Sequence, residues 1–213
     1  MGDEPYTIPL PWVVFAVIAR SATHGVVWAS VAAVITAATL LATRRGVSGV
    51  PNTLMAGAVA WFAGLGLLGV INNSPTSWLA HNGRAVSAFG FVVIALVSLV
   101  FTPAAASYTR MLVKPSRWKS PRFESLNIHL TLLWALAFLG IATSHLAATW
   151  LSKGSTTGGA LTTFNWIVPV ALGVIAAHWS RRWWDEFVDA DTEHSTADAL
   201  WDLAFAPDDH EMH

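Results

Sequence analysis

Histidines are the side chains in this sequence best suited to hold a cofactor, because a neutral imidazole is a common ligand of haem iron and of metal ions. Five of the eight histidines stand near the ends of long apolar stretches. Those expected on one side of a membrane are His24, His81 and His145, and those expected on the other side are His129 and His178. Two b-type haems could bind if His24 and His145 formed one axial pair and His129 and His178 the other. A haem b or metal-binding electron-transfer subunit is therefore one hypothesis.

The spacing of the two histidines in the stretch 126–150 argues against two haems. His129 and His145 are 16 positions apart, which on a helix turns them about 160° away from each other and separates them by about 24 Å. A helix that supplies ligands to two stacked haems should present both from one face. We therefore expect both imidazoles to be structural, each bonded to a backbone carbonyl, a lipid headgroup or water, and we expect no cofactor.

The overall composition is that of a membrane protein. Of 213 residues, 54% are hydrophobic and 12% are charged, which is about half the charged fraction of ordinary soluble domains, and the mean hydropathy is +0.51. The net charge of −1 gives no case for nucleic-acid binding, and the lack of cysteine excludes disulfides and thiolate metal sites. Motifs of soluble enzymes, such as a Walker loop or a His-Glu-x-x-His zinc site, are missing, so we expect no catalytic residues.

Hydropathy and turn signals divide the chain into five membrane spans and predict an all-α integral membrane protein. The spans are expected at about 25–43, 51–72, 85–102, 126–150 and 161–178. Residues 11–19 are apolar but too short to cross alone, so they could lie in the membrane interface or lengthen the first span. A sixth span would need a turn near residues 20–23, where neither Gly nor Pro favours one.

Positive charges alternate between the loops and predict how the chain is oriented. Nine Lys and Arg residues fall in the first loop, the third loop and the C-terminal flank, against two in the alternate loops, Arg84 and Lys153. Short loops rich in Lys and Arg stay in the cytoplasm. We therefore expect a multi-pass protein of a bacterial plasma membrane with its N-terminus outside and its C-terminus inside. Its expected parts are an extracytoplasmic N-terminus (1–24), a five-helix transmembrane domain (25–180) and an acidic cytoplasmic tail (181–213).

Tryptophans support these boundaries, because their amphipathic rings anchor at headgroup depth. Trp78 falls at an expected outer boundary, while Trp118, Trp179 and Trp183 fall at inner ones. The stretch 178–184 is therefore interpreted as a collar at the membrane surface.

Polar residues within the spans stand mainly on the last two. They are Asn127, Thr131, Trp134, His145 and Thr149 on the fourth span, and Thr162, Asn165 and Pro169 on the fifth. Such residues usually bond neighbouring helices and less often line a pathway. Ionisable groups at mid-membrane depth mark ion paths, but Arg84 and the histidines fall toward span ends. A proton-coupled carrier is therefore not expected, while a passive channel or a lipid-handling protein is an alternative.

The tail holds most of the acidic residues of the chain. A short amphipathic helix is predicted over Ser195–Ala206, because its first four residues, Ser-Thr-Ala-Asp, have the form of a capping box. Leu200 and Trp201 should lie at the centre of a docking face, with Asp198 and Asp202 complementary to the basic third loop or to a partner subunit. The tail therefore predicts a protein contact in addition to the lipid bilayer.

A series of packing and boundary residues runs through the segment 84–178. It consists of Ser98-Leu-Val, Pro103, Tyr108, Trp118, Ser120-Pro-Arg-Phe123, Asn127, Thr131-Leu-Leu-Trp134-Ala-Leu-Ala-Phe138 and Phe164-Asn165. This series resembles an uncharacterised group of small bacterial polytopic membrane proteins, which is itself similar to inner-membrane proteins of the intracellular septation protein A type. The resemblance covers under half of the chain and implies a five-helix envelope protein with no assigned reaction.

These observations together predict a non-catalytic polytopic subunit or scaffold of a bacterial plasma-membrane complex. It would contact protein partners through its helix faces and its tail. A b-haem or metal-binding electron-transfer subunit is one alternative. A passive channel or lipid-handling membrane protein is the other.

Overall fold

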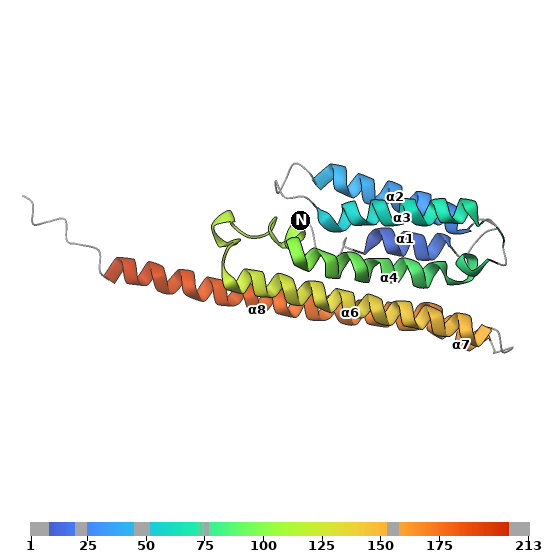
Figure 1. Ribbon diagram of the computed structural model, residues 1–213. Coiled ribbons are helices and arrows are strands. Elements are labelled where there is room, and N and C mark those ends of the chain that lie inside the picture. The colour runs from blue at the N-terminus through green and yellow to red at the C-terminus, as the bar shows by residue number, and fades with distance from the viewer. Residues whose placement is uncertain are drawn as a thin grey trace, which may run out of the picture.

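A computed structural model of the chain describes residues 9–19, 25–44, 52–72, 74, 77–152 and 158–204; of residues 44, 152, 158 and 191–204 it describes the backbone alone. These residues are helical almost throughout and contain no strand, which confirms the expected all-α class. The helices run side by side in an elongated bundle (Figure 1). They are α1 (Leu10–Ile18), α2 (Gly25–Arg44), α3 (Thr53–Ile71), α4 (Trp78–Phe101), α5 (Ala106–Thr109), the 3-10 turn η2 (Pro115–Arg117), α6 (Pro121–Ser152), α7 (Gly158–Thr162), the π-helical turn η3 (Thr163–Ile167) and α8 (Val168–Ala204).

Five helical stretches among the described residues are long and apolar enough to cross a membrane, as expected: α2, α3, α4, α6 and the run from α7 through η3 into α8. One boundary that differs is the start of α4, which lies at Trp78 rather than at Ala85. Its start is set by Ser77, whose hydroxyl oxygen accepts a hydrogen bond from the backbone N–H of Ala80 at 3.2 Å. Hydropathy marks the part of a helix that suits lipid, whereas the capping side chain marks where the helix begins.

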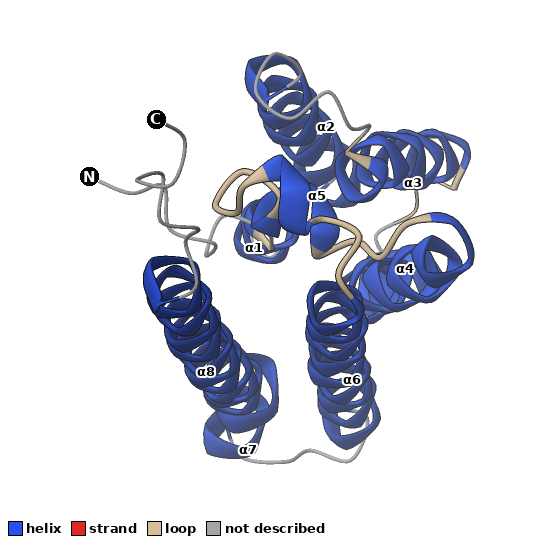
Figure 2. Cartoon of the chain, turned by 90° about the vertical axis from the view of Figure 1, so that its left-hand side faces the viewer, coloured by secondary structure: helices blue, strands red, loops and turns tan. Residues whose placement is uncertain are grey.

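Residues 10–18 form a separate helix, α1, which lies toward the centre of the bundle (Figure 2). A Cβ atom on Gly25 would meet the carbonyl oxygen of Ala19 at 2.8 Å, so the end of α1 lies against the start of α2. Trp12 and Phe15 are buried against aromatic rings of α3 and α4. The segment thus differs from both expected placements, because ring packing and a 2.9 Å bond from the Trp12 indole N–H to the Ser87 carbonyl oxygen hold it inside the bundle.

Residues 102–120 fold back over one end of the bundle and are held there by buried polar bonds. The Thr109 hydroxyl donates to the side-chain amide oxygen of Asn127 at 2.5 Å. The backbone N–H of Ala105 donates to the hydroxyl of Thr131 at 3.2 Å. These two polar residues of α6 therefore bond a neighbouring segment, which is the use that their spacing predicted.

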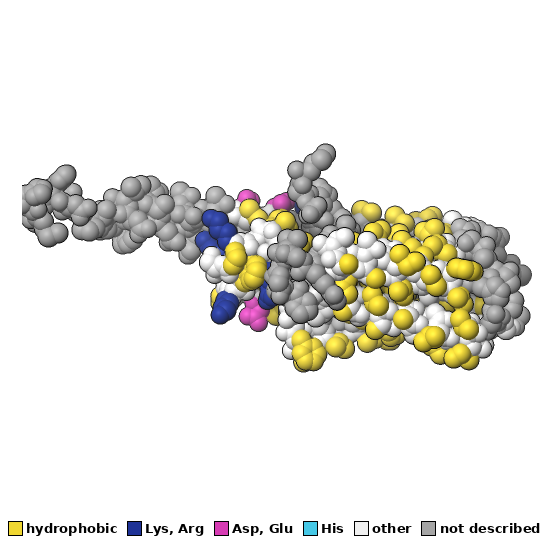
Figure 3. Space-filling model, turned by 90° about the horizontal axis from the view of Figure 1, so that it is seen from above, with side chains coloured by type: hydrophobic (Ala, Val, Ile, Leu, Met, Phe, Trp, Pro, Cys, Tyr) yellow, Lys and Arg dark blue, Asp and Glu magenta, His cyan; other side chains and the backbone are white. Residues whose placement is uncertain are grey.

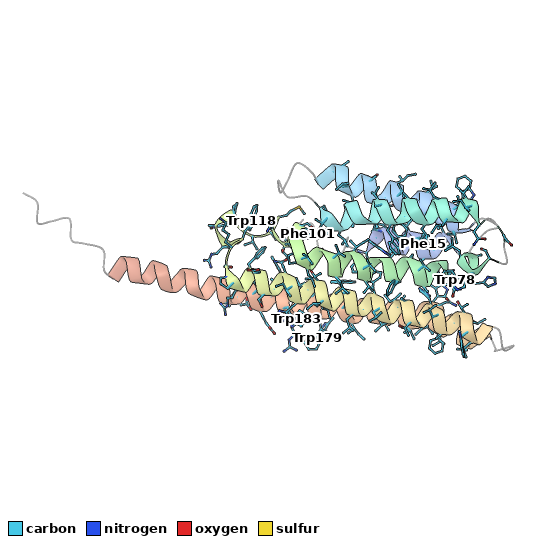
Figure 4. All side chains as sticks on the ribbon, in the orientation of Figure 1. Phe15, Trp78, Phe101, Trp118, Trp179 and Trp183 are labelled. Atoms are coloured by element: carbon cyan, nitrogen blue, oxygen red, sulfur yellow. The ribbon has the colours of Figure 1, made fainter. Side chains whose placement is uncertain are left out.

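Lys and Arg side chains gather at this same end, which we call the basic end: the cations of residues 110–122, together with Arg181 and Arg182 of α8 (Figure 3). Apolar side chains are spread over the rest of the described surface in that view, which shows hardly any charged side chain there. Trp118, Trp179 and Trp183 lie toward the basic end, whereas Trp78 lies toward the opposite end (Figure 4). Two of the three basic segments that the charge pattern assigned to one side of a membrane therefore lie at one end of the molecule.

The last helix, α8, runs without a break from Val168 to Ala204 and extends past the rest of the bundle (Figure 1). The prediction of a separate helix that begins at Ser195 is therefore wrong, because Ser195 lies inside α8. No Gly or Pro stands between the Trp183-Trp184 pair and Ser195 to end the helix first. The side chains of the predicted docking residues, Asp198, Leu200, Trp201 and Asp202, lie outside the described residues, so their docking stays a prediction.

Candidate ligand-binding cavity

A cavity of about 360 Å³ lies between α1, α4, α6 and the segment formed by η3 and α8. Helix α6 packs closely against both α4 and α8, and α1 and α8 also contribute residues to the lining. Most of the lining is apolar or aromatic, and the polar groups are few. Both the size and the lining are typical of small-molecule sites, in which a few placed polar groups orient an otherwise apolar ligand.

Three polar side chains from three helical segments meet at one end of the cavity: Arg84 of α4, His145 of α6 and Asn165 of η3. The side-chain amide oxygen of Asn165 accepts a hydrogen bond from Nη1 of Arg84 at 3.4 Å and lies 3.3 Å from Nδ1 of His145. Because an amide oxygen can only accept, Nδ1 carries the proton in the second contact. The amide nitrogen of Asn165 donates to the carbonyl oxygen of Leu161 at 3.0 Å, which fixes which way the amide faces.

The π-helical turn η3 presents Asn165 and Trp166 to this end of the cavity. Pro169 explains the irregular turn, because it lacks the N–H that would bond the Asn165 carbonyl, and its ring would clash with that carbonyl in a regular α-helix. The guanidinium carbon of Arg84 lies 5.6 Å from the centre of the Trp166 ring, within the range of a cation–π contact. Such π-helical turns occur often at functional sites.

The apolar part of the cavity is lined by rings that are themselves firmly packed. Phe138 is stacked on Phe91 with 4.0 Å between ring centres, and Trp12 stands edge-on to Phe91 at 4.9 Å. The indole N–H of Trp134 donates to the hydroxyl of Ser180 at 3.1 Å, which joins α6 to α8. The aromatic wall is therefore held in place by the bundle before any ligand enters.

Two residues lie elsewhere than the sequence indicated. Arg84 was assigned to an outer loop, but it lies in the second turn of α4 and is half-buried. His145 is only 5% exposed, and its Nδ1 bonds the side chain of Asn165 from η3, where a bond to a backbone carbonyl, headgroup or water was expected. The Ser77 cap starts α4 early enough to include Arg84, and Asn165 gives both side chains a hydrogen-bond acceptor in the bundle, where a polar group without a partner would be costly.

The other histidines singled out by sequence analysis do not join this site. His129 is exposed, and its Nδ1 lies 2.7 Å from the carbonyl oxygen of Ser125, which is the kind of contact that was expected of it. His178 is exposed on α8, and His24 lies outside the described residues. Within the described part of the chain, no three His, Asp or Glu side chains form a group that could hold a metal ion.

The convergence of Arg84, His145 and Asn165 was not predicted. Asn165 and Pro169 were grouped with the polar residues of the last span, and a proline four residues after Asn165 is the local signal of an irregular turn. Nothing in the sequence pairs Arg84 with a residue 81 positions away. Because that pairing depends on how the helices are arranged in the bundle, it could be seen only in the fold.

No family model, no curated protein and no solved structure matches this chain. The resemblance to proteins of the septation protein A type therefore stays a prediction. The function must be argued from the cavity and from the surfaces of the chain itself.

Proposed function

We propose that this chain is a non-catalytic multi-pass membrane protein that binds a lipid-like molecule in the cavity between α1, α4, α6 and α8. The observation that carries the proposal is the cavity itself, about 360 Å³ in volume, with a mostly apolar lining and hydrogen-bonding groups gathered at one end. Such a lining suits a ligand that is largely hydrocarbon and has a small polar head. Of the roles considered from the sequence, this is the lipid-handling one.

A passive channel has less support from the same cavity. Its lining carries Arg84, His145 and Asn165 at one end, whereas Trp12 and Phe138 stand on the apolar part. A pore for ions or water needs polar groups or a wet path along its length. The separation of a polar end from an apolar slot instead favours a molecule that has the same two parts.

Filling the cavity tests the proposal. A Cβ atom on Gly173, which lines the cavity, has no neighbouring atom within 4 Å, so Gly173→Leu should be accommodated and should occupy ligand space. Gly64 on α3 has the same open surroundings but lies outside the cavity, so Gly64→Leu is the matched control. The full chain would be purified in mild detergent, and the lipids that it retains would be extracted, then identified and quantified by mass spectrometry.

The wild type and Gly64→Leu should retain an amphiphile at close to one molecule per chain, and Gly173→Leu should lose most of it. Equal retention by all three proteins, or retention by none, would contradict binding in this cavity.

The scaffold role expected from the sequence is a second candidate, and the length of α8 favours it. We propose that α8 carries the acidic tail into the cytoplasm of a bacterium, where the tail contacts a partner subunit, while the N-terminus lies outside the plasma membrane. Supporting this, the described cations of residues 110–122 and of α8 lie at one end of the bundle, from which α8 extends (Figures 1 and 3).

Protease digestion of sealed inverted vesicles tests that orientation. The enzyme should remove the tail beyond Arg182 and cut between Lys114 and Lys119. Protection of both regions would mean that the orientation is the reverse. Trp201→Ala should then release a partner subunit that co-purifies with the wild type, and an unchanged set of co-purifying proteins would contradict docking through Trp201.

A further inference from the structure

We propose that the ligand of this cavity is a single-chain amphiphile with a carboxylate head, such as a long-chain carboxylic acid, and that Arg84 binds the carboxylate. This inference rests on the proposed function and adds the chemical class of the ligand to it. Arg84 is the one residue with a permanent charge among the described residues that line the cavity. The ligand that best complements the cavity is therefore apolar with a single negative charge at one end.

The guanidinium of Arg84 is positioned to bind a planar oxyanion. It has five N–H donors in a fixed fork, and its Nη1 donates to the side-chain oxygen of Asn165. The contact with the Trp166 ring and the bond to Asn165 come from the same π-helical turn, so they orient the guanidinium together. Arginine pairs with a carboxylate through two parallel hydrogen bonds, and this geometry favours arginine over lysine at such sites.

The direction of the cavity matches the way a carboxylic acid lies in a leaflet. Arg84 is six residues after Trp78, the first residue of α4, and therefore lies about 9 Å along the helix from its end. On α6 the cavity extends from His145, near the end of that helix, back to Trp134, which is about 16 Å deeper in the bundle. A carboxylate at Arg84 would thus stay near headgroup depth while its hydrocarbon chain followed the aromatic wall toward the centre of the bilayer.

The volume and the charge of the cavity distinguish this class from other lipids. At about 360 Å³ the cavity is at the lower end of the range for small-molecule sites, which favours one hydrocarbon chain over the two of a phospholipid. A phosphate monoester would bring up to two negative charges beside one arginine, and a buried charge that is not paired is costly. A carboxylate brings a single negative charge, which one arginine can pair.

His145 and Asn165 act as positioning residues in this arrangement. Asn165 accepts from both Arg84 and the His145 ring, so the imidazole holds the amide that in turn holds the guanidinium. Neither residue needs to touch the carboxylate. Their loss should therefore weaken binding of an acid more than binding of an uncharged amphiphile of the same length.

Equilibrium binding of three radiolabelled amphiphiles with one hydrocarbon chain in common tests the inference. Palmitate carries a carboxylate, cetyl alcohol carries a hydroxyl and cetyl phosphate carries a phosphate. They would be titrated onto the full chain in detergent, for the wild type, Arg84→Gln, Arg84→Lys and Gly173→Leu. Arg181→Gln is the matched charge control, because Arg181 is exposed on α8 and does not line the cavity.

Arg84→Gln should weaken palmitate binding by about ten-fold or more, as expected for hydrogen bonds to a charged group, and leave cetyl alcohol binding within about two-fold. Arg84→Lys should recover part of the loss, and Arg181→Gln should change neither ligand. Gly173→Leu should weaken both. Retention of the wild-type circular dichroism spectrum and of a single gel-filtration peak would show that each variant is folded. If Arg84→Gln does not fold, Arg84→Lys takes its place as the test of the carboxylate contact.

Each contrary result refers to a different claim. In one contrary result, Gly173→Leu weakens palmitate and cetyl alcohol binding equally, but neither Arg84 variant weakens palmitate binding more than cetyl alcohol binding. This result would overturn the carboxylate inference and leave the proposed function standing. Tighter binding of cetyl phosphate than of palmitate would overturn the choice of carboxylate. If no amphiphile binds the wild type, or Gly173→Leu binds them all as the wild type does, the proposed function fails and the inference fails with it.

Discussion

The two ends of α6 use the same kinds of side chain for different purposes. At one end His145 lies near Arg84 and Trp166, and at the other end His129 lies near Arg122 and Trp183. The first set lies between α1, α4 and α8, and its histidine is 5% exposed. The second set lines an open cleft between α6 and α8, and its histidine is exposed.

The difference lies in what surrounds the residues. His129 contacts the backbone of its own helix, through the carbonyl oxygen of Ser125, and the edge of the Trp183 ring at 6.0 Å between ring centres. His145 contacts a side chain from another helix, and that side chain also holds Arg84. A cluster bonded across helices is held in one arrangement and can recognise a ligand, whereas a cluster bonded locally is suited to the membrane surface.

The largest effect on stability is expected from loss of the Trp12 ring, which lines the cavity from α1. Trp12 is 3% exposed, donates to the Ser87 carbonyl and packs against the rings of Phe91 and Phe138. Trp12→Ala should lower the free energy of unfolding by about 3–5 kcal/mol, the range for removal of a buried aromatic side chain. Trp179→Ala at the basic end should cost under about 1 kcal/mol, because that ring is 40% exposed.

Thermal denaturation of both variants in the same detergent would measure the difference. Equal destabilisation by the two substitutions would mean that the surroundings of the cavity are no better packed than the basic end. In that case the contrast between the two ends of α6 would be lost.

A smaller effect separates the two histidines directly. His145→Ala removes one of the two donors to the side-chain oxygen of the half-buried Asn165 and should lower the free energy of unfolding by about 1–2 kcal/mol. It should also weaken palmitate binding several-fold while leaving cetyl alcohol binding unchanged. His129→Ala should change the free energy of unfolding by less than about 0.5 kcal/mol, since its ring is exposed.

Thermal denaturation and amphiphile titration of the two variants, side by side, would check both statements. If His129→Ala proves as damaging as His145→Ala, or if it alone removes a bound pigment, the interpretation of His129 as a structural residue is contradicted. A changed affinity for cetyl alcohol in His145→Ala would mean that the imidazole contacts the ligand itself and does not act only through Asn165.

Sequence reasoning succeeded where a feature depends on local composition. The five spans follow from hydropathy, and the bonding role of Asn127 and Thr131 follows from their spacing on one helix. It failed for α1, because a nine-residue apolar stretch has no local signal that tells an interfacial position from a buried one. Its place is decided by contacts of Trp12 and Phe15 with α3 and α4, which are distant in the sequence.

The polar end of the cavity was missed for a related reason. Each of its residues was interpreted separately: Arg84 as a loop charge, His145 as an interfacial residue and Asn165 as a helix-bonding residue. The third interpretation agrees with the structure, since Asn165 joins α4, α6 and η3. A site made by three helices becomes visible only when the helix faces that turn toward each other are known.

The smallest effect concerns the basic end, where α8 continues past the bundle. If Ser195 capped a separate helix, Ser195→Ala would remove a cap and cost about 0.5–2 kcal/mol of local stability. Inside a continuous α8, the same change replaces serine with the residue of highest helix propensity and should stabilise the segment by a few tenths of a kcal/mol. Amide exchange across residues 195–204 should therefore slow slightly or stay unchanged. The matched control is Ser77→Ala, because the Ser77 hydroxyl does cap α4, and exchange in the first turn of α4 should become faster. Faster exchange in both segments would show that Ser195 is a cap after all and that the tail helix is separate from the last span.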